Sequence, residues 1–484
     1  MQNKMTTIRI DAFIDIILIF AIAVIMLFSS FENNIDLFYV VMSICSVVIT
    51  IITLKFQAKI HGNLFNFSNL FIILCWVFTF GQVLLMAIFS CTGITGYTIV
   101  IDYYGASNTI YALRIILCIY SAVCVGLLVS GKNSVNINET QNIRDYNEEK
   151  IQLENERRYA KNIILITFPV RIITDTLILL AGLRGGLVGS TSMTAAIPDI
   201  VISYGNFSII GLALYVHSLK HNKKQQTLIF FAIVFYFCLM MLNGRRSETV
   251  AYLCVIGLVY VSTRGRVKAV KLLGYFILAY VFLAILYSVV SMRVLYGTNS
   301  LSSFLSCLGQ SLTTKNIVFE ALREYGNTCY TPISVLVRWL PQYGPSWGTS
   351  YYYGATAVLI NIFGIAGKLT KKSNYGFALQ ETSGVLSQYY YNIGGSAFGE
   401  LFFNFGVVGG IVVAIFVGIM IGKISKKVGE TIHDNNNWES IAYMIPLMTS
   451  LLYWIRDYFS GGIREAVWGV LFVYFTRKLI FKRK

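Results

Sequence analysis

The chain has 484 residues, of which 56% are hydrophobic and only 13% are charged. A soluble domain of this size could not bury so much apolar surface, so the composition excludes a water-soluble globular protein and indicates a lipid bilayer as its solvent. The net charge of +16 is not typical of a nucleic-acid-binding protein, because the cations stand at the ends of apolar segments and not in one patch or arm.

Apolar segments of about the length that a helix needs to cross hydrocarbon recur along the chain. They are residues 11–29, 36–54, 69–90, 109–130, 161–181, 198–218, 227–242, 249–262, 271–291, 400–422, 438–455 and 463–480. Two of them, 227–242 and 249–262, are short, which favours helices that end in a cavity beside a polar hinge. We predict an all-α polytopic membrane protein with about 12 transmembrane helices.

The lysines and arginines predict that both termini are cytoplasmic. Most of them fall in the segments that this orientation places inside, and the first two outer loops, 30–35 and 91–108, contain neither residue. This asymmetry is typical of positive-inside sorting. We therefore expect a multi-pass protein of the bacterial inner membrane, whose alternate loops face the periplasm or the outside.

Two connections are longer than the others. Residues 131–160 are polar and of mixed charge, and we expect a cytoplasmic linker, either helical or flexible. Residues 292–399 form an outer segment rich in tyrosine, glycine and tryptophan, too long for an idle connection. Within it, the short apolar stretch Ala355–Gly367 is expected to be interfacial or re-entrant. The predicted domains are membrane helices at 1–130, the linker at 131–160, membrane helices at 161–291, an extracytoplasmic helical loop domain at 292–399, and membrane helices with a basic tail at 400–484.

Arginines recur at the outer ends of the predicted helices, where sorting normally disfavours them. The set is Arg245 and Arg246 in Asn243–Glu248, Arg293, Arg338, Arg456 and Arg464. Each one alone could snorkel to headgroups or pair with a neighbouring acid, as Arg456 could with Asp457 and Arg464 with Glu465. The set as a whole favours a phosphate site, because a guanidinium is always charged and donates two parallel hydrogen bonds.

Carboxylates are scarce on the outer side. Glu248 follows Arg246, and Glu400 opens the tenth predicted span. Each could be an ion-paired helix end or a general base for a sugar hydroxyl. The outer side has no Asp-x-Asp pair and no Cys/His cluster of zinc spacing, so we expect no metal and no cofactor. Within the spans, Arg171 and Asp175 share one helix face and are expected to neutralise each other.

Three stretches carry a resemblance to a known family. Gly394–Gly406, which reads Gly-Gly-Ser-Ala-Phe-Gly-Glu-Leu-Phe-Phe-Asn-Phe-Gly, resembles the signature of O-antigen and capsule repeat-unit polymerases of the Wzy type. Asn243–Glu248 resembles the Gly-Arg-Arg that this family has between two spans, and Tyr343–Tyr351 is similar to its aromatic loop segment. With the topology, the resemblance covers nearly the whole chain. The Arg-x10-Gly loop pattern of some members is not clean here, since Arg338 to Gly348 is one residue short.

The resemblance implies a membrane glycosyltransferase of C-type architecture. Such enzymes polymerise undecaprenyl-pyrophosphate-linked repeat units on the outer face of the inner membrane and release undecaprenyl pyrophosphate. The six arginines would hold the pyrophosphates, and Glu400, or less favourably Glu248, would accept the proton. The sugars would contact Trp339, Tyr343, Trp347, Tyr351 and Asn404. Donor glycan, acceptor glycan and membrane lipid are the expected partners, a chain-length regulator is left open, and no nucleic acid is expected.

Two other functions share this architecture. An O-antigen ligase uses the same chemistry, but the outer-face histidine expected of ligases is missing, since all four histidines fall in predicted cytoplasmic connections or at the cytoplasmic end of a predicted span. A flippase for lipid-linked oligosaccharides would also have a cationic cavity, but it should show two similar halves, and the long outer loop lies only in the second half. We therefore predict a polymerase, with a ligase as the alternative and a transporter less favoured.

Overall fold

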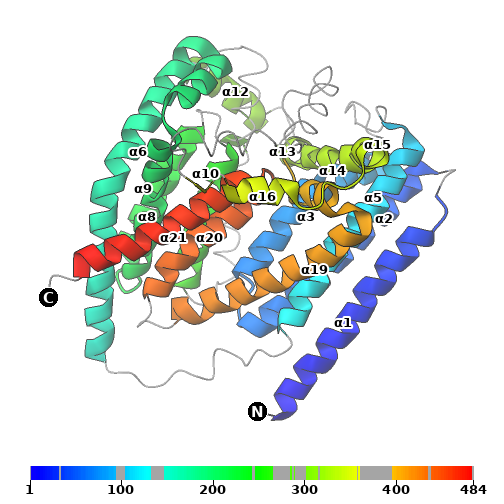
Figure 1. Ribbon diagram of the computed structural model, residues 1–484, viewed down its shortest axis with the longest axis horizontal. Helices are drawn as coiled ribbons and strands as arrows, with labels where there is room; N and C mark the ends of the chain where they lie inside the picture. Colours follow the sequence, from blue (N-terminus) through cyan, green and yellow to red (C-terminus); the bar gives the residue numbers. More distant parts are fainter. Residues whose placement is uncertain are drawn as a thin grey trace. The chain divides into compact units, whose positions relative to one another are not determined.

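The fold is described from a computed structural model (Figure 1). It describes residues 2–31, 34–93, 104–131, 146–241, 246–264, 284–285, 288, 301–313, 317–356, 358–359, 395–433 and 438–481. Arg245, Arg293, most of the ninth predicted span and most of the predicted re-entrant stretch Ala355–Gly367 lie outside these ranges, and the side chain of Arg246 is not described.

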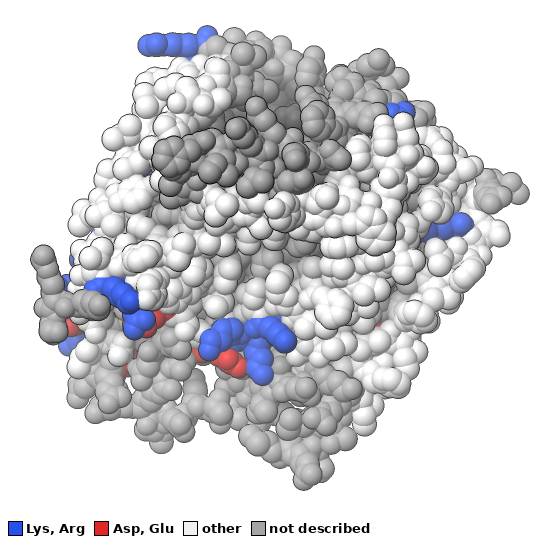
Figure 2. Space-filling model, in the orientation of Figure 1, with Lys and Arg blue, Asp and Glu red and all other residues white. Residues whose placement is uncertain are grey.

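Within the described ranges the secondary structure is helical, without any strand. Seven of the described helices are long and apolar enough to cross a membrane: Ile10–Phe28, Ile35–His61, Phe67–Thr92, Ala106–Gly131, Glu149–Gly182, Asp199–Ser218 and Ala397–Ile432. They match seven of the predicted spans. Large apolar side chains such as Phe20 and Phe28 are exposed, and charged side chains are few among the described residues on the face in Figure 2. The all-helical membrane class is therefore confirmed, and the number of twelve crossings stays a prediction.

The chain divides into two compact units. The first comprises Met1–Gln141, Leu322–Gly429 and Leu451–Arg464. Its long helices are α1 (Gln2–Phe28), α2 (Ile35–His61), α3 (Phe67–Thr92), α5 (Ala106–Gly131) and most of α19 (Ala397–His433). Helix α2 packs against α3 and α5, and α1 packs against α5, as the blue and cyan ribbons of Figure 1 show. Short helices follow from the predicted outer loop: the end of α13 (Ile317–Gly326), η3 (Asn327–Cys329), α14 (Tyr330–Ser334), the π-helix η4 (Val335–Trp339), α15 (Leu340–Tyr343) and α16 (Thr349–Thr356).

Local signals set where the first long helices begin. Asn34 precedes α2, and its side-chain oxygen accepts a hydrogen bond of 2.9 Å from the backbone N–H of Leu37. Asn66 precedes α3 and accepts one of 2.9 Å from the N–H of Asn69. Asparagine satisfies the free N–H groups of a first helical turn well, so both helices start where the sequence offers a cap.

Helices α5 and α19 meet backbone to backbone along a seam of small residues. A Cβ atom on Gly126 would lie 2.1 Å from the carbonyl oxygen of Ile415, and one on Gly418 would lie 2.2 Å from that of Val123. Only glycine fits such distances. In a lipid environment, where apolar burial gives little driving force between helices, this close contact is a main source of helix association.

The second unit comprises Asn142–Ala321, Glu430–Ser450 and Glu465–Lys484. Helix α6 (Tyr146–Ala196) packs against α7 (Asp199–Asn206) and α8 (Ser208–Ser218), and α8 also packs against α10 (Arg246–Ser262). The other helices with residues in this unit are α9 (Lys223–Met240), α12 (Leu301–Thr313), α20 (Trp438–Trp454) and α21 (Phe459–Phe481). Helix α6 has 51 residues, so from residue 146 onward the predicted linker is helical and continues directly into the predicted span.

Candidate active site

Glu400 lies in the first turn of α19 and is 1% exposed. Its carboxylate accepts three hydrogen bonds. The Ser350 hydroxyl donates to Oε1 over 2.7 Å, and the Trp454 indole N–H and the Phe459 backbone N–H donate to Oε2 over 2.8 and 2.9 Å. All three donors are neutral, and no lysine or arginine within the described ranges pairs with this carboxylate. A buried carboxylate without a counter-ion is costly to maintain, which marks Glu400 as a functional candidate.

Asn404, one helical turn after Glu400, holds Ser350 beside Glu400 through its side-chain amide. Its side-chain N–H₂ donates to Ser350 Oγ over 2.6 Å and to the Glu400 carbonyl over 2.7 Å. Its side-chain oxygen accepts from the Ser350 backbone N–H over 3.1 Å. Asn404 is fully buried. Its side-chain amide, which we expected to contact a sugar, is hydrogen-bonded to other groups of the protein.

The Gly-rich start of the motif has a packing reason. Gly395 precedes α19 and lies against the turn between α20 and α21, where a Cβ on Gly395 would be 2.6 Å from the carbonyl carbon of Asp457. Any side chain at this position would push that turn away. The same turn brings Trp454 and Phe459 to Glu400, so Gly395 is needed for the hydrogen bonds to the carboxylate.

Helix α19 is broken at Gly406, whose φ of 67° and ψ of −168° lie in a region that is essentially restricted to glycine. The break coincides with a connection to the outer loop, because the Phe403 carbonyl accepts a hydrogen bond of 2.8 Å from the Ser346 backbone N–H. The turn before α16 is thereby tied to the short first part of α19 that carries Glu400.

An aromatic cluster surrounds this carboxylate. Tyr351 stacks on Phe405 with ring centres 5.7 Å apart, and it meets Phe459 and Trp454 edge to face at 5.0 and 6.3 Å. Burial, together with the nearby charge of Glu400, raises the pKa of the Tyr351 hydroxyl well above its usual value. The hydroxyl therefore stays protonated. It has no hydrogen-bond partner among the described residues.

The other expected sugar contacts lie at the edge of this cluster. Trp339 packs on Tyr343 and Phe403, with ring centres 4.4 and 5.2 Å apart, and its indole N–H is also buried without a partner in the described part of the chain. Tyr343 and Trp347 are exposed, at 56% and 80%. Trp347 also has a φ of 52°, which is uncommon for a large side chain.

The structure describes the side chains of three of the six expected arginines, and all three belong to the unit of Glu400. Arg338 is exposed, with its guanidinium 5.7 Å from the centre of the Tyr104 ring. Arg456 is half-buried and lies over the rings of Phe78 and Tyr325, at 5.7 and 5.4 Å. Arg464 is half-buried as well. The gathering of all six into one pocket stays a prediction.

The second candidate base, Glu248, belongs to the second unit. In the first turn of α10, its Oε1 accepts hydrogen bonds from the Asn206 side-chain amide over 2.7 Å and from the Tyr252 hydroxyl over 2.8 Å. The Tyr252 ring in turn lies 4.8 Å from the guanidinium of Arg171. Glu248 is thus one end of a polar network inside that unit.

The other end of this network is the pair that the sequence predicted. Arg171 Nε lies 3.3 Å from Asp175 Oδ2, and both residues are buried. The Tyr236 hydroxyl donates to the same Asp175 oxygen over 2.7 Å, and the Phe237 ring covers the guanidinium at 4.9 Å. The predicted neutralisation of two buried charges is confirmed.

Sequence reasoning did not find Ser350, Trp454 or the Phe459 backbone N–H. A tryptophan at the end of a span is typical of the membrane interface, and no sequence signal connects Trp454 to a carboxylate 54 residues earlier. For the serine, the nearest signal was its place beside Tyr351 in the aromatic segment.

Comparison with known proteins places the chain beside one family. The family model described as O-antigen polysaccharide polymerase Wzy matches residues 12–484, which is essentially the whole chain. No curated protein and no solved structure matches it.

Proposed function

Since the chain belongs to the O-antigen polysaccharide polymerase Wzy family, we propose that it joins oligosaccharide repeat units that are carried on undecaprenyl pyrophosphate. The reaction takes place at the outer face of the inner membrane, without a metal ion, and releases undecaprenyl pyrophosphate. The fold in this proposal is a C-type membrane glycosyltransferase with about 12 spans and both termini in the cytoplasm. A regulator of chain length is a possible further partner.

The observation that carries the proposal is the buried, uncompensated carboxylate of Glu400. A carboxylate offers about four acceptor positions, and three of them are filled by Ser350, Trp454 and Phe459. The remaining position is on Oε1. A sugar hydroxyl of the acceptor donates its proton there while its oxygen attacks the anomeric carbon of the donor glycan. The new glycosidic bond replaces the bond to pyrophosphate, and Glu400 takes up the proton.

The leaving pyrophosphate needs cations, because negative charge develops on its oxygen as the bond breaks. Arg338 and Arg456, with Arg464, supply guanidinium groups from the unit that holds Glu400. We assign Arg245, Arg246 and Arg293 to the same task from the sequence alone. Guanidinium groups suit this role because they bind phosphate through two parallel hydrogen bonds and keep their charge.

The sugars are proposed to bind along the aromatic cluster. The exposed rings of Trp347 and Tyr343 offer apolar faces for pyranose rings. The Tyr351 hydroxyl and the Trp339 indole N–H are buried donors without partners in the described part of the chain, and a sugar hydroxyl would satisfy each of them. Buried donors of this kind favour a polar ligand, because leaving them unpaired costs free energy.

Glu248 is assigned a different task. Its carboxylate is held by Asn206 and Tyr252 next to the charge of Arg171. This arrangement anchors the first turn of α10, which follows directly on the Gly-Arg-Arg segment. We propose that Glu248 positions this segment and that Glu400 is the base.

The test is the surface polysaccharide of a host strain that lacks the gene. Loss of the long-chain ladder with a single-repeat band retained supports the polymerase, whereas loss of every surface-attached form indicates a ligase or a flippase instead. Complementation with Glu400→Gln should leave only the single-repeat band. Complementation with Asp36→Asn, an exposed carboxylate at the start of α2, should restore the ladder. A full ladder with Glu400→Gln would remove Glu400 from the reaction.

A further inference from the structure

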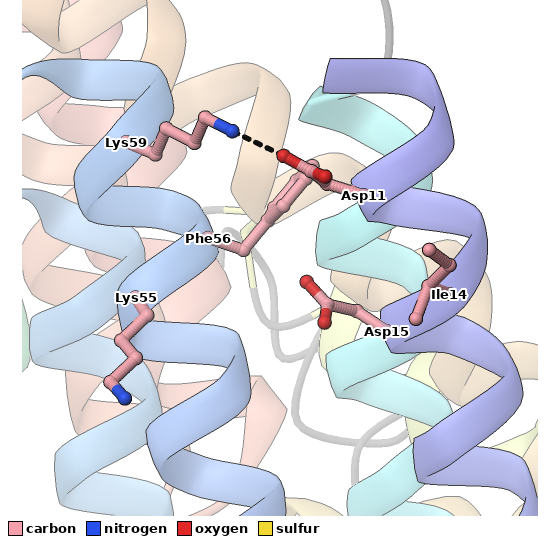
Figure 3. A pocket seen from close by; sticks show the side chains of 6 residues that line it. All are labelled: Asp11, Ile14, Asp15, Lys55, Phe56 and Lys59. Carbon is pink, nitrogen blue, oxygen red and sulfur yellow. Dashed lines mark hydrogen bonds and ion pairs between the residues drawn. The ribbon is translucent and has the colours of Figure 1, made fainter. Parts of the chain in front are cut away.

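A small cavity with four charged residues in its wall lies between α1 and α2, at the end of the pair where α1 begins and α2 finishes (Figure 3). Its volume is about 190 Å³. The residues that line it are Asp11, Ile14, Asp15, Lys55, Phe56 and Lys59. None of them takes part in the glycosyl transfer proposed above, so this cavity calls for a separate explanation.

The four charged residues form two levels, one helical turn apart. Asp11 and Asp15 are four residues apart on α1, as Lys55 and Lys59 are on α2, so each pair shares a helix face. At the outer level, which is the one nearer the start of α1 and the end of α2, Lys59 donates a hydrogen bond to Asp11. At the inner level, Asp15 and Lys55 pair neither with each other nor with another residue that the structure describes. The cavity therefore offers a carboxylate and an ammonium that are not bonded to each other beside a closed ion pair, and Lys59 also attracts the Asp15 carboxylate.

The inner level stands at the edge of the uncharged part of both helices. Asp15 is the last charged residue before the uncharged run 16–31, and Lys55 is the first charged residue after the uncharged run 37–54. Charged groups at the ends of apolar runs are expected near the border between headgroups and acyl chains. Ile14, which lines the cavity beside Asp15, is 49% exposed, so the cavity opens to the outside of the helix pair.

The size of the cavity excludes a sugar repeat unit, since pockets for drug-sized ligands measure about 300–1,000 Å³. Its charges call for a ligand with one anionic and one cationic end. We propose that the cavity binds the headgroup of an aminophospholipid, with its phosphate at Lys55 and its primary ammonium at Asp15. A primary ammonium carries three N–H donors for a carboxylate. A choline headgroup has none, and a glycerol headgroup has no positive charge.

Native mass spectrometry of the purified full-length protein tests this proposal. The protein is titrated with phosphatidylethanolamine, phosphatidylcholine or phosphatidylglycerol of identical acyl chains. We expect one phosphatidylethanolamine to bind about tenfold more tightly than either other lipid, as loss of one charge-assisted hydrogen bond predicts. Asp15→Asn should remove this preference. Equal binding of phosphatidylglycerol would reveal a plain anion site, and equal binding of phosphatidylcholine would show that no N–H donor is recognised. Either result overturns the proposal.

A charge exchange separates recognition from folding. Asp15→Lys alone places two cations at the inner level and should abolish the preference, whereas Asp15→Lys combined with Lys55→Asp recreates opposite charges and should restore it. Asp36→Asn, at the other end of α2, where Asp36 accepts a hydrogen bond from Ser90, is the matched control and should bind as the wild type does. Size-exclusion profiles verify that each variant is folded. A folded double variant without the preference refutes the proposed headgroup site.

Discussion

Replacing Glu400 by glutamine separates the chemistry of this carboxylate from its role in the fold. Glutamine has nearly the same shape, and its carbonyl oxygen can still accept from Trp454 and Phe459. Its N–H₂ group then faces Ser350, whose hydroxyl already accepts a hydrogen bond from Asn404. The serine proton would lose its acceptor, and the two remaining bonds would no longer be charge-assisted. We expect a cost in stability of about 1–3 kcal/mol.

The loss of activity should be much larger than this stability cost explains. A positioned general base contributes about 10²–10⁴-fold to a rate. Chain extension from lipid-linked repeat units should therefore fall by that factor when it is expressed per folded protein. The folded fraction is measured by size-exclusion chromatography and by the melting temperature in detergent, and extension by gel analysis of the products.

Two variants that keep the carboxylate provide the control. Ser350→Ala and Trp454→Phe each remove one donor to Glu400 and should cost a similar amount of stability. They should retain measurable extension, because the proton acceptor is still present. If folded Glu400→Gln extended chains within twofold of the wild type, or if all three variants lost activity in proportion to their stability, the carboxylate would be structural only.

Three further outcomes follow from the geometry. Arg338→Ala should reduce extension about 10²–10³-fold at unchanged expression, because the side chain is exposed; normal ladders would exclude it from the pyrophosphate site. Gly406→Ala should lower stability by about 1–3 kcal/mol because of its φ of 67°, whereas Gly257→Ala, with open space around it, should not destabilise the protein. Arg171→Leu should cost about 3–5 kcal/mol, because the Asp175 carboxylate stays buried without the Arg171 charge beside it, and adding Asp175→Leu should recover most of that loss in a double-mutant cycle.

The sequence was sufficient to predict those features of the fold and the site that one physical requirement determines. The hydrocarbon core demands long apolar helices, so the first four predicted spans agree with α1, α2, α3 and α5 to within a few residues at most ends. Spacing on one helix was equally informative, since Arg171 and Asp175 stand four residues apart and do pair. Glu400 also lies at the start of a long helix, as the motif indicated.

Features that depend on contacts between distant segments could not be predicted in this way. The donors from Trp454 and Phe459 reach Glu400 only because the turn after α20 packs on Gly395. No periodicity in the sequence encodes such an approach. From its place in the motif, we expected Asn404 to contact a sugar. The side chain is buried, and its amide makes hydrogen bonds within the protein. The role of Arg245, Arg246 and Arg293 stays a prediction, because their side chains lie outside the described part of the chain.

The glycine seam between α5 and α19 has a consequence for which part of α19 can move. With Gly126 and Gly418 in direct backbone contact, the part of α19 after Gly406 cannot slide along α5 without a clash. Glu400 stands on the other side of Gly406, on the short segment that is hydrogen-bonded to the turn before α16 and to the turn that leads into α21. Any displacement that admits a glycan would therefore carry the carboxylate and these two turns together, while the rest of α19 stays in place.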